Sequence, residues 1–167
     1  MVIGFWKRND EYGCCSNWYP ASITIDGITF TCCEQYMMYQ KAILFNDHEI
    51  ADKIINTTIP KDIKALGRQV KNFDPIIWDK HKEMIVGTAV MAKFIQHPDL
   101  YKKLQESGDA IMCEAAPNDN IWGIGMAADN PKMQNPEEWQ GTNLLGKIVM
   151  NVRTLIAQGK TRYESIL

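Results

Sequence analysis

The chain of 167 residues lacks long apolar runs, a strong excess of either charge, and regular spacing among its few cysteines and histidines. No stretch reaches the roughly 18 apolar residues that span a bilayer, and the first ten residues lack the apolar core of a secretory signal. We therefore expect a cytoplasmic protein. The formal net charge of −2 excludes a broad basic surface for tracking nucleic-acid phosphates but leaves a local anion pocket open.

The cysteines show neither CxxC spacing nor a nearby histidine cluster, and they stand at Cys14, Cys15, Cys32, Cys33 and Cys113. This odd number in adjacent pairs favours buried thiols in a reducing compartment over a disulfide framework or a zinc site. The three histidines share no helical face with a carboxylate. The sequence therefore predicts no metal site and no cofactor.

What is present suits one compact domain, since 46% of the residues are hydrophobic and the length is typical of a single core. Alternation in "ASITIDGITF" around Asp26-Gly27 predicts an antiparallel hairpin. Helical patterns follow at 33–45, 47–56, 60–68, 75–96 and 98–106, with Thr57 and Thr58 as caps before the third. The pattern predicts an α+β domain that is mainly α-helical with a small β-sheet.

The C-terminal third begins with "DAIMCEAA", which predicts one buried strand. A long loop rich in Gly, Asn and Pro follows, and loops of this length in compact domains are usually functional. A last helix should begin at the Thr142-Asn143 cap signal. We expect a domain over residues 1–158 and a loosely held, flexible tail over 159–167.

The stretch "CCEQYMMYQKAILF" puts a carboxylate and an ammonium group seven residues apart in a segment that is otherwise mostly apolar or aromatic. On an α-helix, Lys41 lies about 20° around the axis from Glu34, on a face shared with Met37 and Met38. The opposite side is also apolar or aromatic, so the helix should be mostly enclosed. Because burying a lone charge costs several kcal/mol, such sites either pair the charge or use it.

Two interpretations of this pair stay open. In a structural role, Glu34 would hydrogen-bond a neighbouring loop while the Lys41 side chain extends to water. In a catalytic role, the carboxylate would lie near a desolvated lysine, whose lowered pKa supplies a neutral amine. Enclosure by Met37, Leu44 and Phe45 would lower the pKa of Lys41 in this way.

Other polar groups suggest a ligand rim. Glu114, Asp119 and Trp122 follow the predicted strand, where carboxylates can accept from ribose hydroxyls and the indole can stack on a heterocycle. Arg68 follows a helix that ends at Gly67 and is a candidate for phosphate, as is the helix start at 141–143. Each residue also has an ordinary structural interpretation, as a turn, a cap or a surface ion pair.

Taken in chain order, six motifs from about Phe5 to Ala157 resemble those of the NADAR family: "SNWYP", "CEQYMMYQKA", "LGR", Trp78, "EAAPNDNIWGIG" and "WQGTNLLGKIVMNVR". This family is associated with NAD and ADP-ribose and includes the YbiA-type N-glycosidases. The resemblance implies an α-rich α+β domain that hydrolyses the N-glycosidic bond of a phosphorylated ribosyl compound. Its implied substrates are ADP-ribosylated guanine in nucleic acid or phosphoribosylamino-pyrimidine intermediates of the riboflavin pathway.

The resemblance places the family's glutamate on Glu34 and its reactive lysine on Lys41, and we add Asp119 as the third catalytic candidate. The predicted substrate-binding residues are Ser16, Asn17, Arg68, Trp78, Glu114, Trp122, Gly123, Gly141 and Asn143. Many family members have histidine after the glutamate, whereas this chain has Gln35. A proton-transfer role for that histidine is therefore unavailable here.

Cleavage of an N-glycoside builds positive charge at the anomeric carbon, which Glu34 can stabilise. Alternatively the sugar ring opens and neutral Lys41 forms a Schiff base that water later hydrolyses. Either Glu34 or Asp119 would transfer the proton. Two other functions remain, a non-catalytic module that binds ADP-ribose or NAD and a vestigial interaction domain, but neither needs a reactive amine.

Overall fold

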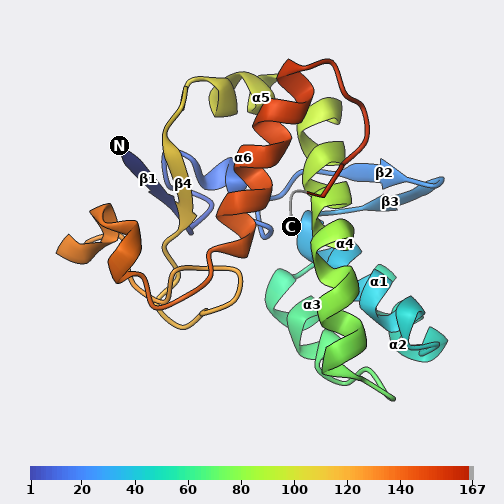
Figure 1. Cartoon of the computed structure of the whole chain (residues 1–167). Coiled ribbons are helices and arrows are strands. Elements are labelled where there is room, and N and C mark those ends of the chain that lie inside the picture. Colours follow the sequence, from blue (N-terminus) through green and yellow to red (C-terminus); the bar gives the residue numbers. More distant parts are fainter. Residues whose placement is uncertain (166–167) are drawn as a thin grey trace.

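The computed structural model describes residues 1–165, and six α-helices make up nearly half of that part of the chain (Figure 1). Their bounds are α1 (Cys33–Leu44), α2 (His48–Ile55), α3 (Pro60–Gly67), α4 (Pro75–Gln96), α5 (Pro98–Gln105) and α6 (Leu144–Ala157). Each predicted helix is present, with its ends within two residues of the expected positions. The mainly α-helical α+β architecture is confirmed.

Four short strands form two separate pairs: β1 (Val2–Phe5) with β4 (Ile111–Glu114), and β2 (Ile23–Ile25) with β3 (Ile28–Phe30). The second pair is the predicted antiparallel hairpin, and its two turn residues, Asp26 and Gly27, both have positive φ. The first pair is parallel, with Val2 opposite Ile111 and Phe5 opposite Glu114. Strand β1 was not predicted, because its partner lies at the other end of the chain.

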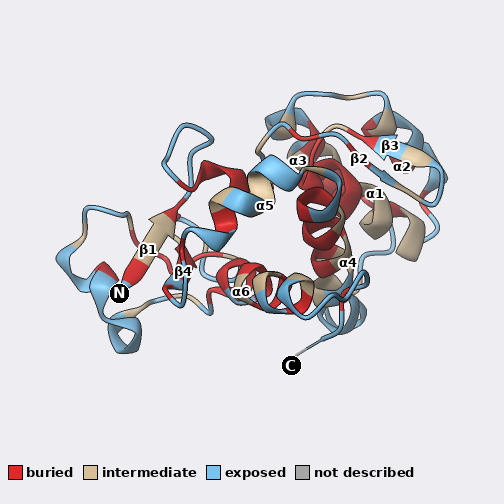
Figure 2. Ribbon diagram, turned by 90° about the horizontal axis from the view of Figure 1, so that it is seen from above, coloured by how far each residue is buried: buried red, intermediate tan, exposed pale blue. Residues whose placement is uncertain are grey.

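The main core lies where α1, α4 and α6 face one another (Figure 2). Helix α1 packs against α2, α3 and α4, while α6 packs against α4 and β4. A smaller apolar cluster joins the β1–β4 pair to the loop after it through Val2, Cys113, Ile124, Met126 and Met133. Three short 3-10 helices, η1 (Gly13–Cys15), η2 (Pro131–Gln134) and η3 (Pro136–Glu138), interrupt the loops.

Helix caps differ in part from the expectation. Asp47 and Asp74 accept backbone N–H groups at the starts of α2 and α4. The predicted Thr57 and Thr58 caps are wrong, because Ile59 occupies the N-cap position of α3 without a side-chain hydrogen bond. Thr57 instead donates its hydroxyl to the carbonyl of Lys53.

The C-terminal segment packs against α4 through Tyr163. This side chain is only 6% exposed, and its hydroxyl donates to Glu83 Oε1 at 2.7 Å. Any side chain at Gly87 would collide with the Tyr163 ring, so the ring rests directly on α4. The segment expected to be loosely held is therefore anchored at this residue, while residues 166 and 167 of the predicted tail lie outside the described residues.

Candidate active site

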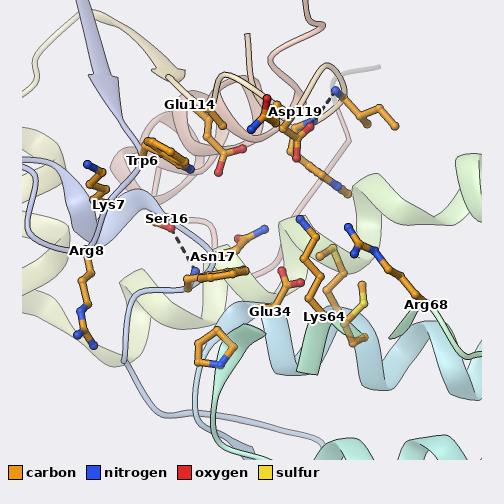
Figure 3. A pocket seen from close by; sticks show the side chains of 18 of the residues that line it. Trp6, Lys7, Arg8, Ser16, Asn17, Glu34, Lys64, Arg68, Glu114 and Asp119 are labelled. Atoms are coloured by element: carbon orange, nitrogen blue, oxygen red, sulfur yellow. Dashed lines mark hydrogen bonds between the residues drawn. The ribbon is translucent and has the colours of Figure 1, made fainter. Parts of the chain in front are cut away.

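A cavity of about 890 Å³ opens between α1, α3, the start of α4 and three loop segments at 6–9, 16–18 and 116–122 (Figure 3). The lining comes from distant parts of the sequence that the fold brings together. Of the twelve predicted site residues, nine line it: Ser16, Asn17, Glu34, Lys41, Arg68, Trp78, Glu114, Asp119 and Trp122. A cavity of this size is typical of small-molecule sites.

One face of α1 forms the cavity floor. Glu34, Met37, Met38 and Lys41 all line it, at the spacing i, i+3, i+4 and i+7 that the helical pattern predicted. Glu34 lies in the first turn of α1, and its backbone N–H donates to the carbonyl of Asn17 at 3.0 Å. The loop that carries Ser16 and Asn17 is therefore fixed to the start of the helix.

Glu34 is 4% exposed, and this burial raises its pKa to about 7. The negative charge of Asp119 acts in the same direction, while Lys64, the side chain of Trp18 and Lys41 favour the ionised form. The carboxyl group can therefore change protonation state near neutral pH. This property suits a group that takes part in proton transfer or stabilises a developing cation.

Lys41 is half-buried, and its Nζ donates to the carbonyl of Gly67 at 2.8 Å. The amine also lies 4.4 Å from the ring centroid of Phe73 and 5.8 Å from that of Trp78. Desolvation lowers the pKa of Lys41, and nearby Arg68 lowers it further against the opposing effect of Glu34. The shift has the predicted direction, and the rings of Phe73 and Trp78 lie beside the amine.

Two enclosed polar atoms face the cavity without a protein partner. They are Asn17 Oδ1 and Glu114 Oε2, and no other buried side-chain oxygen or nitrogen in residues 1–165 is left unpaired. Native proteins rarely leave such atoms unsatisfied, so both point to a ligand. Burial raises the pKa of Glu114 to about 8, with further repulsion from Asp119 and Glu34 and an opposing effect of Lys64.

Asp119 also lines the cavity, but one of its oxygens is held by the chain. Its Oδ1 accepts the backbone N–H groups of Ile121, Trp122 and Gly123 at 2.9, 2.7 and 3.4 Å. These bonds shape the turn that presents the Trp122 side chain to the cavity. The geometry thus gives Asp119 a structural contribution besides any role in the reaction.

The start of α6 is not free to bind an anion. The backbone N–H groups of residues 142–145 donate to the carbonyls of residues 120–123 at 2.9–3.1 Å, so the helix end is already saturated. Gly141 and Gly123 allow these two segments to approach, because a side chain at Gly141 would collide with the carbonyl of Gly123. Neither glycine lines the cavity.

Asn143 joins α6 to β4 rather than facing a ligand. Its backbone adopts the left-handed conformation with a φ of 53°, and its side chain does not cap the helix. The amide Nδ2 donates to the carbonyl of Met112 at 2.9 Å, and Oδ1 accepts the backbone N–H of Glu114 at 3.1 Å. Asn143 thus holds the N-cap position where the helix was expected to begin, but its side chain fixes the strand that carries Glu114 instead of capping the helix.

Gln35, which follows Glu34 in α1, points away from the cavity. Its Nε2 donates to the carbonyls of Ile54 and Thr57 at 3.0 and 2.8 Å, and its Oε1 accepts the backbone N–H of Thr31 at 2.7 Å. The side chain thus holds the end of α2 against the start of α1. The site chemistry falls to other residues.

Several lining residues were missed by the sequence reasoning. They include Trp6, Lys7, Arg8, Trp18 and Lys64. Trp6 and Trp18 are each 41% exposed, and Trp6 and Lys7 lie at the end of the cavity opposite Arg68 (Figure 3). The mixture of aromatic and basic residues in "FWKRND" was the available signal, because this combination recurs where proteins hold planar anionic ligands.

Lys93 of α4 was also missed. It is fully buried beneath the cavity, and its Nζ donates to the carbonyl of Ser16 at 3.0 Å. A lysine in a long helix is usually a surface residue, so the sequence carried no signal for this one. Its bond supports the Ser16-Asn17 loop from below.

The lining combines two carboxyl groups that titrate near neutrality, a partly desolvated amine, basic side chains and several tryptophans. This set can bind a phosphorylated ligand with a planar ring and can move protons at its sugar. Within the described part of the chain, no three His, Cys, Asp or Glu residues are grouped to hold a metal ion. No helix in residues 1–165 has both the length and the apolar character needed to cross a bilayer.

Comparison with known proteins identifies the family. The NADAR domain model matches residues 4–157. N-glycosidase R617 of Acanthamoeba polyphaga mimivirus is 44% identical over 143 residues, covering 83% of this chain and 84% of that protein. N-glycosidase Npun_R5314 of Nostoc punctiforme is 33% identical over 153 residues, with 92% and 91% covered.

The fold agrees with this assignment. N-glycosidase YbiA of Escherichia coli is 30% identical over 156 residues, covering 93% of this chain and 89% of that protein. The NMR structure of the E. coli protein YbiA superimposes with a TM-score of 0.79 at 28% identity, covering 99% of this chain and 90% of that chain. The chain therefore belongs to the NADAR family, and as a relative of several named N-glycosidases over most of its length it is an enzyme of the N-glycosidase class.

Proposed function

We propose that the protein hydrolyses the N-glycosidic bond of a phosphorylated ribosyl compound in this cavity. The observation that carries the proposal is the shared floor of α1, where a buried carboxyl with a pKa of about 7 and an amine with a lowered pKa face one space. Glu34 can stabilise the positive charge of N-glycoside cleavage, and Lys41 can form a Schiff base with the sugar. The N-glycosidase names of the relatives support the same bond type.

The lining gives the substrate an orientation. Lys64 is on α3 and Arg68 directly follows the end of this helix; both side chains extend toward the cavity, where they would hold a phosphate (Figure 3). The unpaired Asn17 Oδ1 would accept a ribose hydroxyl. Trp122 would stack on the heterocycle that leaves, with Trp78 as a further aromatic contact.

The anomeric carbon would then lie above α1. Ionised Glu34 would stabilise the positive charge that grows as the C–N bond lengthens. Neutral Lys41 would add to the opened sugar as a Schiff base, which water hydrolyses. Lys41 must lose a proton to act in this way, and its desolvated position favours that loss.

Two substrate classes fit the proposal. One is ADP-ribosylated guanine, free or in nucleic acid, and the other is the phosphoribosylamino-pyrimidine class of riboflavin intermediates. Incubation with ADP-ribosylated guanosine and with a phosphoribosylamino-pyrimidine, followed by mass analysis, separates them. Release of guanosine and ADP-ribose supports the first class, while release of an aminopyrimidine and ribose 5-phosphate supports the second.

The same experiment tests a second candidate, a non-catalytic module that binds ADP-ribose or NAD. Trp6 and Lys7, at the end of the cavity opposite Arg68, would serve binding alone (Figure 3). Saturable binding of ADP-ribose with no product from either substrate would favour the module. Absence of both binding and product would contradict both functions.

A further inference from the structure

Glu114 presents an enclosed oxygen to the cavity that nothing in the described chain satisfies. Its Oε2 is one of two such atoms, and the other, Asn17 Oδ1, faces the same cavity. An unpaired buried carboxyl oxygen is costly, so its retention points to a partner that arrives with the ligand. Unlike an amide oxygen, a carboxyl group can give that partner a proton.

The backbone around Glu114 is fixed from two sides. Its N–H donates to Asn143 Oδ1 at 3.1 Å, and its carbonyl accepts the N–H of Ile124 at 2.9 Å. Along β4, the Cys113 side chain enters the smaller apolar cluster, so alternation turns Glu114 the other way. Figure 3 shows Glu114 and Glu34 projecting into the cavity from opposite walls.

The environments of the carboxyl groups separate their roles. Asp119 Oδ1 is held as an acceptor by three backbone N–H groups, whereas Glu114 Oε2 is free for a ligand. Burial and the neighbouring carboxylates raise the pKa of Glu114 to about 8, above the value of about 7 for Glu34. Near neutral pH the pair therefore offers one protonated group and one group that can be ionised, an arrangement typical of acid and base partners.

We propose that Glu114 is the general acid that protonates the leaving nitrogen, an inference that rests on the proposed N-glycosidase function. The Glu114 carboxyl gives its proton to the nitrogen as the bond to the anomeric carbon breaks, and the electron pair of that bond stays on nitrogen. Water adds to the anomeric carbon opposite Glu34, and its proton returns to the Glu114 carboxylate. One water is consumed and the acid is restored.

In the Lys41 route Glu114 protonates the same nitrogen when the bond between that nitrogen and the anomeric carbon breaks. The attacking amine, rather than water, then returns a proton to the Glu114 carboxylate, and water hydrolyses the adduct later. In both routes the nitrogen leaves as a neutral group. The role of Glu114 is therefore independent of which nucleophile first takes the anomeric carbon.

Leaving-group dependence tests this role. Glu114→Gln should lower turnover of the N-riboside that the wild type hydrolyses by roughly 10²–10⁴-fold, the usual contribution of a general acid. With 4-nitrophenyl ribofuranoside 5-phosphate the loss should be much smaller, because nitrophenolate leaves without a proton. The affinity of Glu114→Gln for ribose 5-phosphate, measured by tryptophan emission, should differ little from that of the wild type. Equal losses on both substrates with weaker product binding would show that Glu114 only positions the sugar.

The pH profile is a second, independent test. For the wild type, kcat/KM should fall as pH rises through about 8, where Glu114 loses its proton. Glu114→Gln should lack this alkaline limb, and a limb that persists in the variant overturns the proposal. The other charged groups that line the cavity stay in place in this variant, namely Glu34, Lys41, Lys64, Arg68, Asp119, Lys7 and Arg8.

The outcomes separate this inference from the proposed function. A wild-type protein that cleaves neither N-riboside contradicts the N-glycosidase proposal itself. A wild type that cleaves an N-riboside while Glu114→Gln cleaves it equally well contradicts only the role of Glu114. Glu137→Gln, an exposed change in η3 outside the cavity, is the matched control and should leave turnover unchanged.

Discussion

At the junction where residues 120–123 meet the start of α6, four successive backbone amides and the side chain of Asn143 all find partners within the chain. In the adjoining cavity, Asn17 Oδ1 and Glu114 Oε2 have no such partner, and the amine of Lys41 is partly desolvated. Both regions contain asparagine side chains. They differ in whether the chain itself satisfies their polar atoms.

This difference distinguishes polar residues that stabilise the fold from polar residues that serve the site. An unsatisfied buried polar atom costs about 1–3 kcal/mol, so a fold retains one only where something else compensates. At the junction, substitutions should lower the free energy of unfolding. In the cavity, they should lower activity and in some cases raise stability, because functional sites keep strained or unpaired groups.

The largest effect should come from the cavity floor. Lys41→Arg keeps a positive charge but removes the neutral amine, because arginine stays protonated at working pH. Turnover should fall by at least roughly 10³-fold, the scale for loss of a nucleophile, while the melting temperature changes little. Lys53→Arg, at an exposed ion pair with Glu49, is the control. Turnover of Lys41→Arg near the wild-type rate would exclude Lys41 as the nucleophile.

Glu114→Gln should stabilise the protein at high pH. Burial raises the folded-state pKa of Glu114 to about 8 from the ordinary value of 4.5, so wild-type stability falls as pH rises between these values. Glutamine cannot ionise. At pH 9 the variant should therefore gain on the order of 5 kcal/mol in free energy of unfolding, with the gain shrinking toward pH 5.

Urea unfolding across this pH range measures the effect. Glu137→Gln should show no such dependence, since it is exposed. A variant that is equally or less stable than the wild type at pH 9 would mean that Glu114 is ionised and compensated in the folded protein.

Asn143→Ala tests the junction. The change removes two hydrogen bonds to the backbone of β4 and leaves their buried partners unpaired. The free energy of unfolding should fall by about 2 kcal/mol. Asn46→Ala is a matched control, because Asn46 also has a positive φ of 57° but its exposed side chain makes no hydrogen bond within residues 1–165. Equal losses in the two variants would assign the cost to backbone conformation alone.

Arg68→Ala should give the smallest effect. Its side chain lines the cavity but is exposed, so solvent screens its charge. Binding of ribose 5-phosphate should weaken by about tenfold while unfolding stays unchanged. Arg162→Ala, outside the cavity, provides the comparison in calorimetric titrations. Unaltered affinity in Arg68→Ala would mean that the phosphate binds instead at Lys64 or at the end of the cavity that holds Lys7.

The sequence predicted those features that depend on local pattern. Periodicity of 3.6 residues located the helices, and it also placed Glu34 and Lys41 on one face. Strand β1 was missed because parallel pairing with β4 depends on residues at the far end of the chain. Pattern along the chain does not reveal such a partner.

Residue type and family resemblance did not distinguish side chains that line the cavity from those whose contacts lie within the chain. Gly123, Gly141 and Asn143 looked like ligand-binding residues, yet their contacts join α6 to its own preceding loop. Lys93 looked like a surface lysine and is buried beneath Ser16. Only the three-dimensional partners of a polar atom distinguish these cases.

Reductive trapping at Lys41 is the most direct test of the account. Borohydride added during turnover of the hydrolysed N-riboside should reduce a Schiff base to a stable sugar adduct, and peptide mass analysis should locate it on the segment that contains Lys41. Lys41→Arg should yield no adduct. Sustained wild-type turnover without any adduct, together with an active Lys41→Arg, would contradict the covalent route and leave Glu34 and water to carry the reaction.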